Sequence, residues 1–242
     1  MEDSQERYQD YLNFVKKYSK HLGDKGDYKK REIEIIDDIK LFPECEKGAI
    51  KLMVDSGTDP KEAEKRARIG IRDENGWGVS LAEPMRLPDG SYTVYVRPVS
   101  WGTLDSGIAG VVIVPILSDG RFILLNNFRP NVRSWSLEFP RGGKDPGISL
   151  LKMLKKEISE EMGARILEAP EKIGEVFPDS GFLGSLVEIY KAKVEITGLP
   201  SHEATEAIKN LVFVSKEKLK NLIESRKIRD GYTLSALALM NL

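Results

Sequence analysis

The chain has 242 residues, which is enough to bury a full core in one large domain or in one domain with an appendage. Its formal net charge of −1 argues against the concentrated basic surface that phosphate-backbone binding needs, so we expect no nucleic-acid partner. No apolar run approaches the length of a membrane span, and no apolar signal core follows the acidic residues 1–8. We therefore expect a cytoplasmic protein without a membrane partner. The single cysteine, Cys45, excludes an intramolecular disulfide and is interpreted as a buried small residue.

The first part of the chain, residues 1–75, is predicted to form an N-terminal helical extension. It is rich in Glu, Lys and Asp with scattered apolar positions, a pattern typical of amphipathic helices. Breaks around Gly23, Pro43 and Gly57 separate the segments, and Asp59 followed by Pro60 is a typical helix start. The predicted helices cover residues 5–19, 29–41, 45–54 and 60–69.

From Trp77 the pattern changes to short β-rich runs, with hairpin turn sequences at residues 88–90 and 118–120. The predicted strands cover residues 78–82, 92–98, 109–116, 122–126, 134–138, 169–176, 186–194 and 211–214. The predicted helices cover residues 150–162, 216–226 and 232–241. Strands that flank one strong helix and precede C-terminal helices indicate an α/β sandwich over residues 76–242.

The most informative segment is a glycine loop, residues 142–148, that runs into an acidic helix. At about 100° per residue, Glu157, Glu160 and Glu161 share a face. The apolar stripe is predicted elsewhere on the helix, at Leu151, Leu154, Ile158 and Met162. Like charges at these spacings cost about 0.2 to 0.5 kcal/mol per pair, so a neighbouring cation would stabilise them. Oxygen ligands suit magnesium or manganese, whereas from the glutamates alone a solvated acidic face is the alternative.

This segment resembles the signature of the Nudix hydrolases: glycine, any five, glutamate, any seven, then arginine, glutamate, aliphatic, any, glutamate, glutamate, any, glycine, aliphatic. Counted from Gly142, the matching positions are Glu157, Ile158, Glu160, Glu161 and Gly163. Two positions depart, because Ile148 replaces a glutamate and Lys156 replaces the arginine. We expect Ile148 to pack against the aliphatic stem of Lys156 in place of that ion pair. The resemblance implies an α/β fold, a Nudix α/β/α sandwich with a mixed β-sheet, here with the N-terminal helical extension.

Residues 128–130 and 137–143 resemble the approach to this motif in the ADP-ribose diphosphatase branch. Residues 177–182 resemble the branch's Pro-Gly loop, and residues 228–234 resemble the start of its C-terminal helix. The resemblance implies substrate-binding roles for Arg129, Glu138, Gly142 and Gly181. A surface or structural role remains the alternative for Arg129, and a salt bridge remains the alternative for Glu138.

The resemblance also implies a metal site and a catalytic base. Glu157 and Glu161 would bind Mg²⁺, with Mn²⁺ as the alternative, and Glu160 would bind directly or through water. The backbone carbonyl of Arg141 would complete the shell. In this branch the base is a glutamate on a loop after the motif, and Glu206 is preferred to Glu203 here. Either glutamate is alternatively a plain surface residue.

The implied activity is Mg²⁺-dependent hydrolysis of the pyrophosphate bond of a nucleoside diphosphate derivative, with ADP-ribose giving AMP and ribose 5-phosphate. One alternative substrate class is a nucleotide sugar or a dinucleoside polyphosphate. Another alternative, suggested by Ile148 and Lys156, is a degenerate, non-catalytic ligand-binding or regulatory module. The partner in each case is a small-molecule nucleotide, and the branch implies a homodimer.

Overall fold

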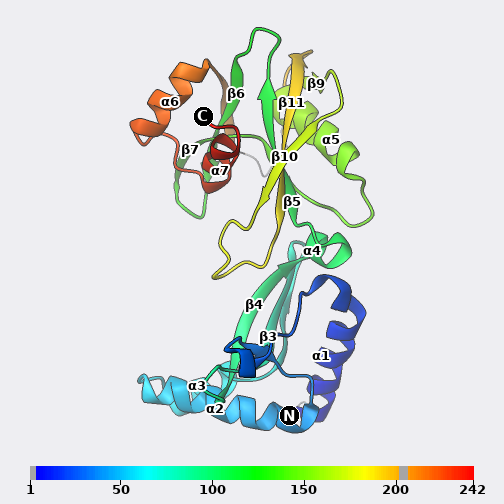
Figure 1. The fold of residues 1–242 in the computed structure, drawn as a ribbon, viewed down its shortest axis with the longest axis vertical. Coiled ribbons are helices and arrows are strands. Elements are labelled where there is room, and N and C mark those ends of the chain that lie inside the picture. Colours follow the sequence, from blue (N-terminus) through cyan, green and yellow to red (C-terminus); the bar gives the residue numbers. More distant parts are fainter. Residues whose placement is uncertain (1–3, 202–206) are drawn as a thin grey trace. The chain divides into compact units, whose positions relative to one another are not determined.

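The computed structural model describes residues 4–201 and 207–242. The chain forms two compact units, Met1–Gly107 with Asp179–Gly184, and Ile108–Pro178 with Ser185–Leu242 (Figure 1). The units do not divide where the sequence changes character, near residue 75. They divide after Gly107 because the strand at residues 78–86 belongs to the N-terminal unit. This strand pairs with the strand at residues 92–100 and with two earlier segments of the same unit.

The N-terminal unit is built on a four-stranded sheet whose central strand is β3 (Gly78–Arg86). Strand β4 (Tyr92–Ser100) pairs along one edge, while β2 (Gly70–Glu74) and the short β1 (Glu34–Ile35) share the other edge. The helices of this unit are α1 (Ser4–Tyr18), α2 (Phe42–Asp55), α3 (Pro60–Arg66) and α4 (Trp101–Ser106).

Two apolar clusters hold this unit together. One contains Tyr8 and Tyr11 of α1 with Phe42 and Cys45 of α2, and Cys45 is fully buried, as predicted. The other places strand residues against the C-terminal half of α1, where Phe14 and Tyr18 pack. Its buried members are Val79, Leu81, Val99 and Leu104. Helix α1 therefore buries an i, i+3, i+7 stripe, which is why residues 5–19 show helical periodicity.

One predicted helix of this unit is wrong. Residues 29–41 were predicted to be helical, but they form the 3-10 turn Tyr28–Lys30, strand β1 and the 3-10 turn Ile39–Leu41. The reason is tertiary, because β1 pairs antiparallel with Met85 and Arg86 of β3, far away in the sequence. Strand β2, which follows the predicted helix over residues 60–69, and helix α4 were not predicted.

The C-terminal unit is a mixed sheet with helices on both faces (Figure 1). Its main strand order is β10-β11-β5-β6-β12, in which β11 runs parallel to β5 and the other pairs are antiparallel. The strands are β5 (Gly110–Ile116), β6 (Phe122–Arg129), β7 (Ser134–Glu138), β8 (Arg141–Gly143), β9 (Ala164–Ile166), β10 (Glu171–Val176), β11 (Val187–Ile196) and β12 (Ile208–Val214). The helices are α5 (Leu150–Met162), α6 (Lys216–Glu224) and α7 (Gly231–Leu239).

Strand β5 explains the layers of this unit. Val111 and Ile113 belong to the cluster that contains α5, whereas Val112 and Val114 belong to the cluster that contains α6 and α7. Successive strand side chains point to opposite faces, so a strand covered on both faces reads as a continuous apolar run. The predicted α/β/α sandwich with a mixed sheet is confirmed.

No helix in the described part of the chain is long and apolar enough to cross a membrane.

Candidate active site

The acidic helix α5 begins and ends where the sequence predicted. Its buried side chains are Met153, Leu154, Ile158, Glu161 and Met162, and Gly163 ends it in the left-handed conformation with φ 60°. The predicted apolar stripe is wrong at one position, because Leu151 is 47% exposed and Met153 is buried instead. The helix packs on β5 and β6 through its buried apolar side chains, and Glu161 is buried together with them.

Gly142 brings the glycine loop against the acidic helix. Strand β8 pairs with β5, so that Gly142 lies opposite Val111. A Cβ atom added at Gly142 would lie 2.3 Å from both Cδ and Oε1 of Glu157. The Glu157 carboxylate therefore occupies the space that any other residue at position 142 would fill. Glu157 and Gly142 are therefore in contact, and Arg141 directly precedes Gly142 on the strand.

The three glutamates of the motif have different surroundings. Glu161 is 2% exposed, whereas Glu157 and Glu160 are half-buried. Lys156 Nζ lies 3.5 Å from Glu160 Oε2, an i, i+4 ion pair on the exposed side of the helix. Ile148 packs against the apolar cluster beneath α5. The predicted contact between Ile148 and the stem of Lys156 stays a prediction.

The donor set of this region fits magnesium chemically but is not gathered into a cage. Within residues 4–201 and 207–242, no group of three or more His, Cys, Asp or Glu side chains is arranged to hold a metal ion. Magnesium usually keeps several waters and takes one or two protein carboxylates together with substrate phosphates, so a cage of three carboxylates is not required. Glu157 and Glu161, one helical turn apart, and the backbone of Arg141 supply the oxygen donors that such a site uses.

Glu138, at the end of β7, is the centre of a buried ionic network. Its carboxylate is fully buried and accepts hydrogen bonds from Asn127 Nδ2 at 3.1 Å and from Arg129 Nε at 2.9 Å. Arg141 Nη2 lies 3.8 Å from the other carboxylate oxygen, and Arg141 Nη1 donates to Asp230 at 3.0 Å. The salt-bridge role considered for Glu138 is thus present, and Glu138 holds Arg129 in place.

Asp230 and Thr233 tie this network to α7. Asp230 caps the helix, because its Oδ2 accepts the backbone N–H and the hydroxyl of Thr233 at 2.9 and 2.8 Å. The Thr233 hydroxyl in turn accepts the backbone N–H of Phe139 at 2.9 Å. The end of β7 and the start of α7, about 90 residues apart in sequence, are thereby fixed to each other.

A cavity of about 480 Å³ opens beside this network. Its lining residues are Arg129, Asn131, Val132, Ser134, Trp135, Ser136, Arg141, Lys227, Arg229, Asp230 and Gly231. Four of them are cationic and one is acidic, so the cavity attracts anions even after the buried Glu138 is counted. Trp135 is 49% exposed, and its ring packs against Phe128 with centroids 5.6 Å apart. A fixed, half-exposed indole beside several cations suits a ligand with both an anionic group and a flat ring.

The fold is similar to that of a solved ADP compounds hydrolase, with a TM-score of 0.60 and 21% sequence identity. The match covers 72% of this chain and 89% of that chain. The fold is therefore Nudix-like. No family model matches the sequence, and no curated protein matches it.

Three predicted site residues are not part of the site described above. Glu203 and Glu206 lie outside the described residues. Gly181 belongs to the N-terminal unit, where its carbonyl oxygen accepts a hydrogen bond of 2.6 Å from the Tyr95 hydroxyl. The predicted roles of all three residues therefore stay predictions.

Sequence reasoning missed Trp135, Lys227 and Arg229 as cavity residues. The resemblance of residues 228–234 to the start of a family helix indicated this segment of the chain, but it assigned no role to Arg229. Trp135 is the exposed residue of β7 and lies between two half-buried serines, a pattern that alone indicates only a solvent-facing strand residue.

Proposed function

We propose that this chain is a pyrophosphohydrolase that acts on a nucleoside diphosphate derivative, with ADP-ribose as the leading substrate. The observation that carries the proposal is the double placement of Arg141. Its side chain lines the cationic cavity, and its backbone immediately precedes Gly142, against which the Glu157 carboxylate lies. A diphosphate near Arg141 would thus meet both the cations of the cavity and the carboxylates of α5.

The phosphates and the base of such a substrate each have a matching group in the cavity. Arg129 and Arg141 suit phosphate oxygens, because a guanidinium donates two parallel hydrogen bonds and is held in direction here by Glu138 and Asp230. Trp135 offers a ring face for a nucleobase. Lys227 and Arg229 add positive charge to the lining.

Hydrolysis needs a water attack on one phosphorus, breakage of the bridging P–O bond and removal of the water proton. Magnesium held by Glu157, Glu161 and the Arg141 carbonyl, with Glu160 as a further ligand, would neutralise the phosphate oxygens that repel the attacking water. Glu206, or Glu203 as the second choice, is the proposed acceptor of the proton. The arginines would stabilise charge on the departing phosphate.

A nucleotide sugar or a dinucleoside polyphosphate would present the same diphosphate and base, so both remain alternative substrates. The non-catalytic alternative rests on Ile148 and on the Lys156–Glu160 ion pair. A site without turnover would still bind nucleotide through Arg129 and Trp135, and this difference makes the alternatives separable. A homodimer is proposed from the family resemblance.

The deciding experiment measures release of AMP from ADP-ribose with magnesium, with manganese and with a chelator. Glu161→Gln should lower kcat about 1000-fold, equal to about 4 kcal/mol of lost transition-state stabilisation. Glu224→Gln, which changes an exposed carboxylate on α6, is the matched control and should retain activity. Saturable nucleotide binding without turnover of ADP-ribose, nucleotide sugars or dinucleoside polyphosphates would contradict the hydrolase and favour the binding module.

A further inference from the structure

The N-terminal unit contains a cavity of about 560 Å³ that the proposed hydrolysis does not use. It lies on the α1 side of β3 and β4, and residues between 22 and 37 form part of its lining. Ligand pockets typically have volumes of about 300 to 1000 Å³ and combine apolar walls with a few fixed polar groups. Its apolar walls include Leu12, Val15, Ile33, Ile36 and Met85.

One of the residues that line this cavity has a buried, unsatisfied hydroxyl. Tyr11 lines it and is 1% exposed, and its hydroxyl has no hydrogen-bond partner among the described residues. A buried hydroxyl without a partner costs about 1 to 3 kcal/mol, so such groups normally meet a protein atom, a water or a ligand. The Tyr11 hydroxyl is protonated at neutral pH, where it can donate, and burial raises its pKa further. Tyr8, on the same helix, differs, since its hydroxyl donates to Glu46 at 2.7 Å.

The polar floor of the cavity is a buried ion pair. Glu83 on β3 is 2% exposed, and its carboxylate meets Arg97 on β4 at two points, Nε–Oε2 at 2.7 Å and Nη2–Oε1 at 3.0 Å. Arg97 Nη1 also donates to the carbonyl oxygen of Leu22 at 3.1 Å. The pair cancels its own charge, so it offers hydrogen-bonding groups without requiring a charged ligand.

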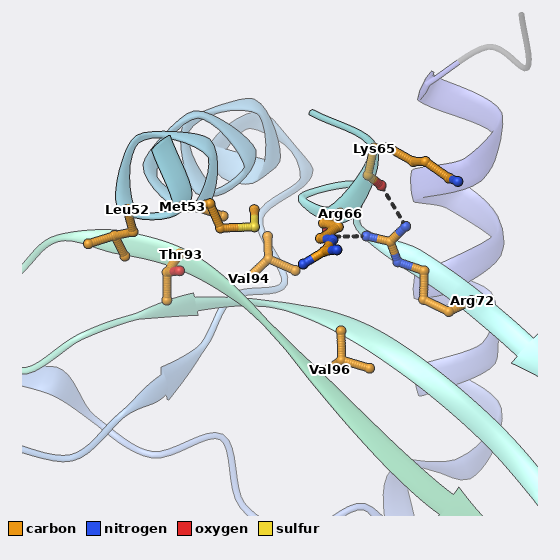
Figure 2. Close-up of a pocket in the computed structure, with 9 residues that line it drawn as sticks. Leu52, Met53, Lys65, Arg66, Arg72, Thr93, Val94 and Val96 are labelled. Carbon is orange, nitrogen blue, oxygen red and sulfur yellow. Dashed lines mark hydrogen bonds between the residues drawn. The ribbon is translucent and has the colours of Figure 1, made fainter. Parts of the chain in front are cut away.

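The remaining charges of the lining disfavour anions. Asp24, Glu32 and Asp37 line the cavity, and among them Asp37 pairs with Lys25. The lining is therefore acidic in balance, and a phosphorylated compound would be repelled. The opposite holds for another cavity of this unit, of about 400 Å³ between α2 and β4 (Figure 2). There Lys65, Arg66 and Arg72 supply positive charge, and the Arg72 guanidinium donates to the carbonyl oxygens of Lys65 and Arg66.

We infer that the α1-side cavity binds an uncharged small molecule that has an apolar body and an amide-type or alcohol-type head group, and that Tyr11 is its main hydrogen-bonding residue. The head group would satisfy the Tyr11 hydroxyl beside Glu83 and Arg97, and the body would contact Leu12, Val15 and the isoleucines of the wall. This ligand differs in class from the anionic substrate proposed for the C-terminal unit.

The test uses benzamide as an uncharged probe and benzoate as its anionic match, titrated into the full-length protein labelled with nitrogen-15. Benzamide should shift the lining amides of Gly23 and Gly26 saturably, and benzoate should bind at least about tenfold more weakly. The amides of Lys65 and Arg72, at the basic cavity, serve as the internal reference for benzamide. Equal or tighter binding of benzoate, or no saturable shift at Gly23 and Gly26, would overturn the inference.

Two variants and one control locate the binding. Tyr11→Phe keeps the buried ring and should weaken benzamide about five- to tenfold. Tyr8→Phe removes a hydroxyl from the same helix away from the cavity and should leave the affinity unchanged. Ile33→Trp, at a position 49% exposed and therefore tolerant, should block the cavity. Equal effects of the two phenylalanine variants, or a crystal structure with only water on the Tyr11 hydroxyl at saturating benzamide, would contradict the inference.

Discussion

Each unit of this protein buries a glutamate against arginine, and the two arrangements differ in how many partners the glutamate has. In the N-terminal unit Glu83 meets Arg97 at two points, and the pair forms the floor of an acidic, largely apolar cavity. In the C-terminal unit Glu138 lies between Arg129 and Arg141, and the arginines extend into a cationic cavity. The charge of Glu83 is balanced by one arginine. Glu138 faces two arginines, so the positive charge beside the cavity exceeds the negative charge of this carboxylate.

The largest expected effect comes from removing one arginine in each unit. Arg97→Ala should cost about 3 to 5 kcal/mol of unfolding free energy, because it strips a buried carboxylate of its two-point partner. Arg129→Ala should cost about half as much, because Arg141 and Asn127 still face Glu138. Urea unfolding followed separately for each unit measures both changes. Arg121→Ala, at an exposed pair with Asp119, is the control and should cost less than about 1 kcal/mol. Equal costs for Arg97→Ala and Arg129→Ala would show that the second arginine contributes nothing.

The next effect concerns the glycine loop of the C-terminal unit. Gly142→Ala must displace the Glu157 carboxylate, so hydrolysis should fall about 100-fold while the fold is kept. The neighbouring Gly143→Ala is the matched control, because a Cβ there meets no atom within 4 Å in the described part of the chain. Steady-state kinetics with ADP-ribose distinguishes the two variants. Similar activities would mean that the position of Glu157 is unimportant for turnover.

A smaller effect should separate the exposed tryptophans of the two units. Trp135→Ala should raise the KM for a nucleotide substrate about tenfold, since stacking of a base on an aromatic ring contributes about 1 to 3 kcal/mol. Trp77→Ala, in the N-terminal unit, removes an equally exposed indole, 51% against 49%, and should leave KM unchanged. Thermal unfolding should be nearly the same for both variants. A KM that rises equally in both would contradict stacking on Trp135.

The smallest effect is a pH dependence of the N-terminal unit. Burial raises the pKa of Glu83 above its ordinary value of 4.5, although Arg97 opposes the shift. The folded state then keeps a proton that the unfolded chain has already lost, so stability falls as pH rises from about 4.5 through the raised pKa. Glu83→Gln lacks this loss, and its melting temperature relative to the unmodified protein should increase over that range. A constant difference in melting temperature between the two proteins across this pH range would contradict the raised pKa of Glu83.

Local patterns predicted most of the C-terminal unit. Helix α5 carries a complete helical period over residues 150–162 and ends at Gly163, so its bounds follow from nearby residues alone. Strand β5 reads as an apolar run because both of its faces are buried. The contact of Glu157 with Gly142 was not predicted, because it depends on the pairing of β8 with β5.

The N-terminal unit was harder to predict because its short elements depend on distant partners. Strand β1 has two residues and exists through its pairing with Met85 and Arg86, whereas its own neighbourhood shows a weak helical spacing. The unit boundary was displaced for the same reason, since β3 and β4 look locally like the start of the following sandwich. Short strands carry too few residues for periodicity to outweigh competing patterns.

The sequence by itself determined the layered α/β architecture and the acidic helix with its glycine loop. Both follow from the spacing of apolar, acidic and glycine residues that are near one another in the chain. Only the tertiary structure decided which charges face which ligand. Arg129 and Arg229 line one cavity although a hundred residues separate them, and Glu83 and Arg97 meet because β3 and β4 pair in one register. Electrostatic surroundings depend on distance and burial in space, and neither is encoded by separation along the chain.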